Sequence, residues 1–354
     1  MRLYKVIIVL VWCLVGMVSC AQKKSKIMKK NVNITLENFN QIMKNKVELY
    51  NEQPMYLLRI NQEYCTYEVL VNDFPVKEYY RSGKLATAIK INRAILKSGP
   101  QKVTIRMYPY GDLLQQEFGE DQPYMSTLKK GSAMLVEVIK VPDWKNYNIS
   151  KEESIKVVKT EGYDNQEFVG AGLPFYEFSF TFNAEVPFEF EGWTNGIDLR
   201  KVDSTLLKQK IISYFKGYQK IYEEENINKY FKINFDKTAR NLTSNYYAHK
   251  AHSGDQVFEE IKEQFLNSLL KKNKDFLPLK DYELSFFGEG KVVTLKQSSS
   301  FKVDKRFRGK SALHFLYQNE DEEFRRMISP YIYLYLPKDK YTGKDEDIQL
   351  EMIK

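Results

Sequence analysis

Two of the three histidines have a spacing that can hold a metal ion. The run His249-Lys250-Ala251-His252 has an H-x-x-H pattern, which on a helix places both rings roughly on one side. Glu259 and Glu260 follow in the next stretch and can supply carboxylates. A structural metal site needs four ligands, a catalytic one needs three, and no cysteine lies near this pair. We therefore expect loop-exposed histidines and no metal site.

Familiar catalytic patterns are not found in the chain. His314 alternates with apolar neighbours, as a partly buried strand residue does, and no G-x-S-x-G serine motif accompanies it. The sequence contains no G-x-G-x-x-G, no G-x-x-x-x-G-K-[ST] phosphate loop and no H-E-x-x-H. Acidic runs at 223–225 and 321–323 are typical of solvated helix ends and loops. A glycosidase needs two carboxylates about 5 to 10 Å apart, and the sequence leaves such a pair open. We lean towards a protein that is not an enzyme and expect no cofactor.

A row of tyrosines is the local feature best suited to recognise a partner. A predicted strand over 326–336 contains Tyr331-Ile332-Tyr333-Leu334-Tyr335-Leu336. Alternation gives the aliphatic residues one face, which suits a core, and gives Tyr331, Tyr333 and Tyr335 the other. If that face is open, it is an amphipathic platform for a peptide, glycan or partner protein. The alternative is a strand buried on both faces.

The first residues have the pattern of an export signal that ends in a cysteine. A short basic region is followed by an apolar run over 6–18, and Ser19 supplies the small residue directly before Cys20. A membrane-spanning helix needs about 20 apolar residues, and this run is shorter. We therefore predict that segment 1–19 is a signal peptide that is removed.

The run Met17-Val18-Ser19-Cys20 resembles the lipobox of bacterial lipoproteins, with Met17 where Leu is commonest. The resemblance implies a diacylglyceryl group on the Cys20 thiol, cleavage before Cys20 and acylation of the new amino terminus. Acyl chains at about 0.8 kcal/mol per buried CH₂ would then hold the protein on a bilayer without spanning it. The alternatives are a plain cleaved signal with an accidental cysteine, or an uncleaved signal anchor.

The residues after Cys20 indicate the membrane. In Gram-negative lipoproteins, an Asp directly after the lipid-bearing cysteine is an inner-membrane retention signal. This chain has Ala21 at that position, so the resemblance favours the outer membrane. The stretch 22–26 is basic and lacks the acidic cluster that resembles a surface-export signal in Bacteroidota lipoproteins, so we expect the protein to face the periplasm. Residues 20–31 are predicted to be a short polar tether.

The remaining cysteine and the charge distribution point to no further chemistry. Cys65 lies in a strand-like stretch without a neighbouring His or basic pair, so we expect a buried, inert thiol and no intramolecular disulfide. The net charge of +8 is modest when 28% of residues are charged, and no nucleic-acid partner is expected. The densest basic cluster is predicted to be a solvated hairpin loop, with a contact for anionic headgroups or an acidic partner as the alternative. It consists of Lys302, Lys305, Arg306, Arg308 and Lys310.

Residues 32–197 are predicted to form an all-β sandwich. Short β runs separated by turn signals recur through this half. The predicted strands are 55–60, 65–71, 89–97, 103–108, 133–141 and 149–159, with a turn at 72–75 and a hairpin of 175–182 with 186–190. The stretch 89–109 resembles the strand, corner and strand of Ig-like or jelly-roll sandwiches. The alternating aromatics of 176–182 are assigned to the core, with a sugar-stacking platform as the alternative.

Near Asp198 the pattern changes to a helical period. Helices are predicted from Asp203 or Ser204 through Tyr218, over 237–248, and from Ser253 or Asp255 through Leu269. Strand patterns return at 282–287, 291–296, 312–317 and 326–336. Residues 198–354 are therefore predicted to form an α+β domain with helices on one face of an antiparallel sheet. This order loosely resembles the NTF2-like cone folds.

These observations favour a lipid-anchored periplasmic protein without enzymatic activity that binds a macromolecular partner through its sandwich or its C-terminal sheet. An envelope enzyme acting on peptidoglycan or other polysaccharide, with unrecognised carboxylates in the α+β domain, is one alternative. An immunity-type inhibitor of a toxin, which would also be a lipoprotein without catalytic motifs, is another.

Overall fold

The computed structural model describes residues 33–353 apart from 165–166, 248–253, 299–303, 320–321 and 345–347. The predicted signal peptide, Cys20 and the tether lie outside the described residues. So do both residues of the H-x-x-H pair and Lys302. Within the part of the chain that is described, no helix has the length and apolar character needed to cross a membrane.

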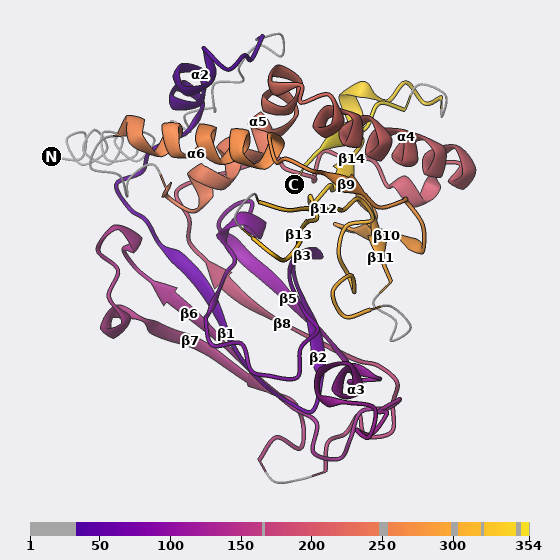
Figure 1. The fold of residues 1–354 in the computed structure, drawn as a ribbon. Coiled ribbons are helices and arrows are strands. Elements are labelled where there is room, and N and C mark those ends of the chain that lie inside the picture. Colours follow the sequence, from indigo (N-terminus) through magenta and orange to yellow (C-terminus); the bar gives the residue numbers. More distant parts are fainter. Residues whose placement is uncertain are drawn as a thin grey trace, which may run out of the picture. The chain divides into compact units, whose positions relative to one another are not determined.

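The first half of the chain builds two four-stranded antiparallel sheets (Figure 1). Their strand orders are β4-β1-β6-β7 and β3-β2-β5-β8. The strands are β1 (Met55–Glu63), β2 (Thr66–Val71), β3 (Phe74–Tyr79), β4 (Ile89–Lys90), β5 (Gly99–Tyr108), β6 (Ala133–Val141), β7 (Glu153–Lys159) and β8 (Tyr176–Ala184). Alternate side chains of both sheets enter one hydrophobic cluster, so the two sheets share a core.

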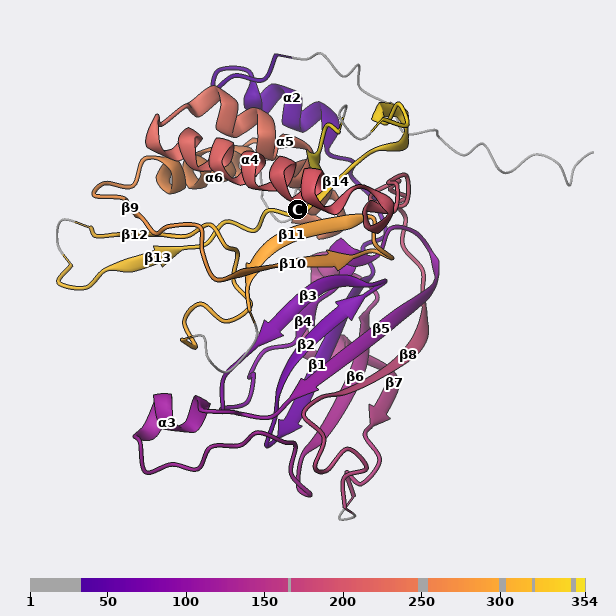
Figure 2. The same cartoon turned by 90° about the vertical axis from the view of Figure 1, so that its right-hand side faces the viewer.

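The second half contributes most of the helices and two smaller sheets. The helices are α4 (Ser204–Glu223), α5 (Ile227–Ser244) and α6 (Gly254–Leu269), and the earlier α2 (Phe39–Lys46) lies beside α5 and α6 (Figure 2). One antiparallel sheet contains β10 (Tyr282–Phe287), β11 (Val292–Gln297), β14 (Leu334–Tyr335) and β15 (Glu351–Met352), and the other contains β13 (Arg326–Ile328), β12 (Phe315–Tyr317) and β9 (Asp275–Phe276). The short elements are α3 (Leu113–Phe118) and 3-10 turns at Asn92–Ala94, Trp144–Asn146, Ile149–Lys151, Leu199–Lys201 and Lys338–Lys340.

Local sequence signals account for several elements. Val103, Ile105 and Met107 of β5 are all fully buried, as their alternation predicts. Asp203 caps α4, because its carboxylate accepts a hydrogen bond from the Leu206 backbone N–H at 2.7 Å. Asn72 and Asp73 both have positive φ, at 53° and 57°, and form the two-residue turn between β2 and β3.

Several predicted elements differ from the structure. The predicted strand 89–97 is only the two-residue β4, because the 3-10 turn Asn92–Ala94 follows it. The hairpin of 175–182 with 186–190 is wrong, because β8 pairs with β5 along its whole length and Pro187 brings no N–H to a second ladder. The single strand over 326–336 is wrong, because β13 ends at Ile328 and β14 begins at Leu334, with Pro330 between them. The second helix begins at Ile227 and not at residue 237. Its start is capped by the Asn226 side chain, which accepts a hydrogen bond from the Lys229 N–H.

One hydrophobic cluster contains side chains from both sides of the predicted boundary at 197/198. Phe74 of β3 stacks on Trp193 with 4.3 Å between ring centroids, and Phe287 and Tyr333 of the second half belong to the same cluster. The fold is thus β-rich, with antiparallel sheets and a few helices. The division into two domains stays a prediction.

Candidate functional site

A cleft of about 240 Å³ lies along α5. One wall is a face of α5 that presents Lys237, Thr238, Arg240, Asn241 and Ser244. The other walls come from distant parts of the chain: Arg93 in the 3-10 turn after β4, Phe74 at the start of β3, Tyr331 before β14, and Ile353 after β15. The turn that carries Arg93 and the strand β15 both pack against α5, and this packing forms the cleft.

The helical period explains how α5 serves both the core and the cleft. Positions 237, 240, 241 and 244 recur at intervals of three and four residues and share one face. Phe231, Phe235 and Leu242 lie elsewhere on the helix and are buried in the protein. A helix predicted to begin at 237 leaves the basic residues without an assigned face, although the spacing of Lys237 and Arg240 indicates that they share one.

Three cationic side chains line the cleft, and none forms an ion pair within the described part of the chain. Arg93, Lys237 and Arg240 are all half-buried. Arg93 donates from Nη2 to the Val76 carbonyl oxygen at 2.5 Å, while its buried Nε has no hydrogen-bond partner among the described residues. Arg240 donates from Nη2 to the Ile353 carbonyl oxygen. Each arginine thus has a backbone carbonyl as its described hydrogen-bond partner, which leaves the positive charge unneutralised.

Burial shifts the acid-base behaviour of these groups. Burial and the charge of Arg240 lower the pKa of Lys237 to about 8. Burial lowers the pKa of Arg240 to about 10 against the opposing pull of Tyr335 and Asp236, and burial also lowers the pKa of Arg93. Each shift has the sign expected when a cation loses more from desolvation than it gains from nearby opposite charge. The cleft is therefore a desolvated positive site suited to an anion.

The residues that line the cleft offer binding groups and, apart from Lys237, no side chain that commonly transfers protons near neutral pH. They include hydroxyl and amide side chains but no histidine, cysteine, aspartate or glutamate. The Thr238 hydroxyl donates to the Asn234 carbonyl oxygen at 2.7 Å, so it remains able to accept a hydrogen bond or to rotate. This lining fits recognition of a negatively charged group better than proton transfer.

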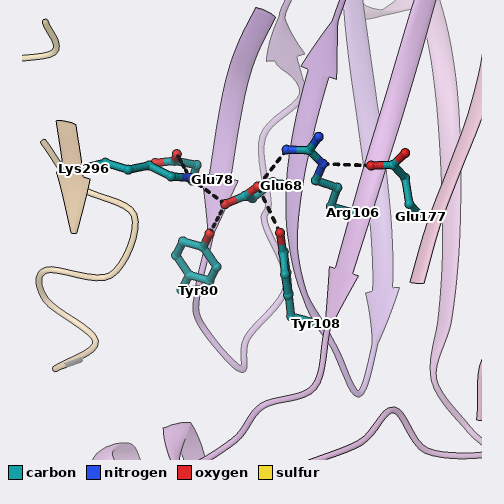
Figure 3. Close-up of polar contacts among 7 residues, drawn as sticks. All are labelled: Glu68, Glu78, Tyr80, Arg106, Tyr108, Glu177 and Lys296. Carbon is teal, nitrogen blue, oxygen red and sulfur yellow. Dashed lines mark hydrogen bonds and ion pairs between the residues drawn. The ribbon is translucent and has the colours of Figure 1, made fainter. Parts of the chain in front are cut away.

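A second polar cluster is centred on the buried pair Glu68 and Lys296 and brings each charge close to an opposite one (Figure 3). Glu68 of β2 lies 3.1 Å from Lys296 of β11 and 3.8 Å from Arg106 of β5. Lys296 also lies 3.5 Å from Glu78 of β3. Tyr80 and Tyr108 donate hydrogen bonds to the Glu68 carboxylate, the second at 3.2 Å. The cluster joins β11 to β2 and β3.

The charges in the Glu68 cluster hold each other ionised. Burial alone raises the pKa of Glu68, but the nearby charge of Lys296 and the hydrogen bond from Tyr80 outweigh it and bring the pKa below its ordinary value. Burial lowers the pKa of Lys296, but Glu68 and Glu78 raise it above the ordinary value. Every charge here therefore has an opposite partner within the protein, in contrast to the cations of the cleft.

The predicted tyrosine row is not one exposed surface. Tyr331 is 43% exposed and lines the cleft, but Tyr333 is 4% exposed and Tyr335 is half-buried. Tyr333 is buried because it packs against Phe74 at 5.6 Å and Phe287 at 5.8 Å between ring centroids. The expectation of an open tyrosine face is therefore wrong at Tyr333. The aliphatic face is buried as predicted, with Ile332, Leu334 and Leu336 all at 0% exposure.

The described part of the basic cluster, residues 305–310, is only partly solvated. Arg308 is 1% exposed and pairs with Asp112 at 2.6 Å. Lys305 donates to the Gln116 carbonyl oxygen at 3.2 Å, so the segment is attached to the chain around α3. The prediction of a solvated loop is wrong for Arg308, because its guanidinium group is buried and forms an ion pair with Asp112.

The remaining candidates occupy structural positions. Cys65 is fully buried, as expected, and burial raises the pKa of its thiol to about 12. His314 is buried, and its ring centroid lies 4.8 Å from that of Phe307. Burial lowers the pKa of the His314 imidazole. Of the aromatic row, Phe182 is buried, while Tyr176, Phe178 and Phe180 are half-buried against the shared core. Among the described residues, no group of three or more His, Cys, Asp or Glu is placed to hold a metal ion.

Comparison with known proteins adds no relative: no family model matches the chain, and neither the curated proteins nor the solved structures give a match.

Proposed function

We propose that this protein is a lipid-anchored protein of the cell envelope that binds an anionic ligand or partner group in the cleft along α5, without catalysing a reaction. The observation that carries the proposal is the convergence of Arg93, Lys237 and Arg240 on one cleft, with no ion-pair partner for any of them among the described residues. The lining supplies charge and hydrogen-bond donors, which is what recognition of an anion requires.

The energetics favour a ligand over a purely structural role. Removing a cation from water without an opposite charge destabilises the folded protein, and three like charges in one cleft repel each other. Buried cations without an opposite charge are expected mainly at functional sites, where a bound anion neutralises them. The Glu68 cluster provides the contrast within the same protein, because its buried cations are matched by carboxylates.

Anion binding can be tested by thermal unfolding. A panel of phosphate, sulfate, citrate, acetate and sugar phosphates should include an anion that stabilises the wild-type protein by about 2.7 kcal/mol at a concentration one hundred times its Kd. Lys237→Met and Arg240→Met should lose this gain. Lys232→Met is the matched control, because Lys232 is exposed on the same helix. If no anion in the panel raises the unfolding temperature of the wild type, the binding function is rejected.

The anchor is the second part of the proposal. The lipobox resemblance and the chain after Cys20 support an outer-membrane lipoprotein that faces the periplasm. Metabolic labelling with a fatty-acid probe should tag the wild type, and Cys20→Ala should lose the label. Cys65→Ala serves as the control and should keep it, because that thiol is buried in the body. Label that persists in Cys20→Ala would contradict attachment at this cysteine.

The finer fold assignment is also a proposal. Residues 32–197 are proposed to be an Ig-like or jelly-roll-like sandwich, and residues 198–354 an α+β domain. Each fragment should unfold in a cooperative transition when expressed alone. The shared cluster around Phe74 and Trp193 predicts that each fragment is less stable than the intact chain. If neither fragment shows a cooperative transition, the two halves depend on one core.

A further inference from the structure

We infer that the cleft along α5 takes a phosphate group in its dianionic form, carried by a compact body such as a sugar or present as free phosphate. This inference rests on the proposed anion-binding function and names its ligand class. Three features of the cleft carry it: the number of positive charges, the types of donor, and the size of the space.

The charge count favours a dianion over a monoanion. Arg93, Lys237 and Arg240 supply three positive charges, and the lining supplies no carboxylate. A carboxylate or a phosphate diester, with one negative charge, would leave two cations unneutralised in a half-buried site. A phosphate monoester carries about 1.5 to 2 negative charges near pH 7, which matches the site more closely.

The donor types fit phosphate oxygens. Two guanidinium groups offer planar sets of N–H donors, which match phosphate geometry, and Lys237 adds a compact point charge. Arg93 and the two α5 cations come from different elements, so they can contact different oxygens of one group. The buried Nε of Arg93, which has no partner among the described residues, is a donor that a phosphate oxygen can satisfy.

The size of the cleft limits the rest of the ligand. Its volume of about 240 Å³ lies below the roughly 300 to 1,000 Å³ of sites that enclose drug-sized ligands. Phe74 and Ile353 are buried and form an apolar wall, while Tyr331 is 43% exposed at the cleft. A single ring can lie against Tyr331, but a nucleotide or an acyl chain would extend outside.

A phosphate dianion bound beside Lys237 should show a characteristic dependence of affinity on pH. The second pKa of a phosphate monoester is about 6, so the dianion predominates above that pH. Lys237 loses its proton above a pKa of about 8, where its charge no longer attracts the ligand. These three cations interact with one another and with the charged or titratable groups Lys77, Asp236, Tyr247, Tyr331, Tyr333 and Tyr335. Affinity should therefore be highest near pH 7 and fall on both sides.

The test is calorimetric titration of the purified full chain at pH 5, 7 and 9. The probes are glucose 6-phosphate and inorganic phosphate, against glucose 6-sulfate, dimethyl phosphate and succinate. Both phosphates should bind more tightly than the other three at pH 7. Glucose 6-phosphate should lose about tenfold in affinity at pH 5 and again at pH 9. Inorganic phosphate should lose more at pH 5, because its second proton leaves at a higher pH than that of a monoester. Tighter binding of glucose 6-phosphate than of inorganic phosphate identifies a sugar-phosphate type of ligand, and equal binding identifies free phosphate. Both outcomes support the dianion.

Variants separate charge from shape. Lys237→Arg should keep binding at pH 7 and lose the decline at pH 9, because a guanidinium stays charged there. Lys237→Met should weaken phosphate binding about tenfold or more at pH 7, and Lys232→Met should leave it unchanged. Tighter binding of succinate or glucose 6-sulfate would overturn the phosphate assignment while leaving the anion-binding function intact. If none of the probes binds and the thermal panel is also negative, both proposals fail.

Discussion

Lys296→Met is expected to lower the free energy of unfolding by about 3 to 5 kcal/mol, the largest effect of a single charge removal in this protein. Lys296 is 6% exposed and is the cation that faces both Glu68 and Glu78. Removing it leaves the buried Glu68 and the half-buried Glu78 without their shared cation, although Arg106 still lies 3.8 Å from Glu68. Urea unfolding followed by tryptophan fluorescence measures the change.

Two comparisons decide whether the loss comes from the buried charge. Lys280→Met removes an exposed lysine nearby in the sequence and should change stability by no more than about 0.5 kcal/mol. Combining Lys296→Met with Glu68→Gln should restore part of the loss, because the second change removes one unpaired charge. If Lys296→Met is as stable as Lys280→Met, the buried charge pair does not stabilise the protein, and water or a local rearrangement compensates the two carboxylates instead.

The effect should also depend on pH in a defined direction. The pKa of Glu68 is lowered in the folded protein, so its pairing stabilises above the unfolded-state value of about 4 and is lost as the pH falls through the folded value. The pKa of Lys296 is raised, so its contribution is present below about 10 and is lost as the pH rises through the folded value. The difference between wild type and Lys296→Met should be largest between these limits.

Tyr333→Ala is expected to destabilise the protein by about 3 to 5 kcal/mol, comparable to a buried phenylalanine truncation. Its ring is buried between Phe74 of β3 and Phe287 of β10, so truncation leaves a cavity where the first and second halves of the chain meet. Leu334→Ala, from the opposite face, should cost about 2 to 5 kcal/mol. Denaturant unfolding of the two variants side by side is the measurement.

Tyr331→Ala is the matched control for the same row. Tyr331 is 43% exposed, so its truncation should destabilise much less than that of Tyr333. Binding should respond in the opposite order, because Tyr331 lines the cleft. If Tyr333→Ala proves as mild as Tyr331→Ala, the packing between Phe74 and Phe287 contributes little to stability.

Sequence by itself determined the features that depend on near neighbours. The burial of Val103, Ile105 and Met107 follows from a period of two, and the start of α4 follows from the capping carboxylate of Asp203. The burial of Cys65 follows from its apolar character in a strand-like stretch, and its inertness from the absence of a neighbouring His or basic pair. These signals act over a few residues, so they survive without knowledge of the fold.

Only the tertiary structure decided which faces are covered and which charges meet. Alternation separated Tyr333 from Leu334 correctly, but it could not show that β3, more than 250 residues earlier, covers the tyrosine side. Glu68 and Lys296 meet across 228 residues of sequence, and Arg93 reaches the cleft from a turn far from α5. Of the three tyrosines predicted as a partner surface, Tyr331 alone lines the cleft. From sequence alone, a charged residue is predicted to be solvated, because most charged residues are exposed. Its burial and its ion-pair partner depend on long-range packing that no local pattern encodes.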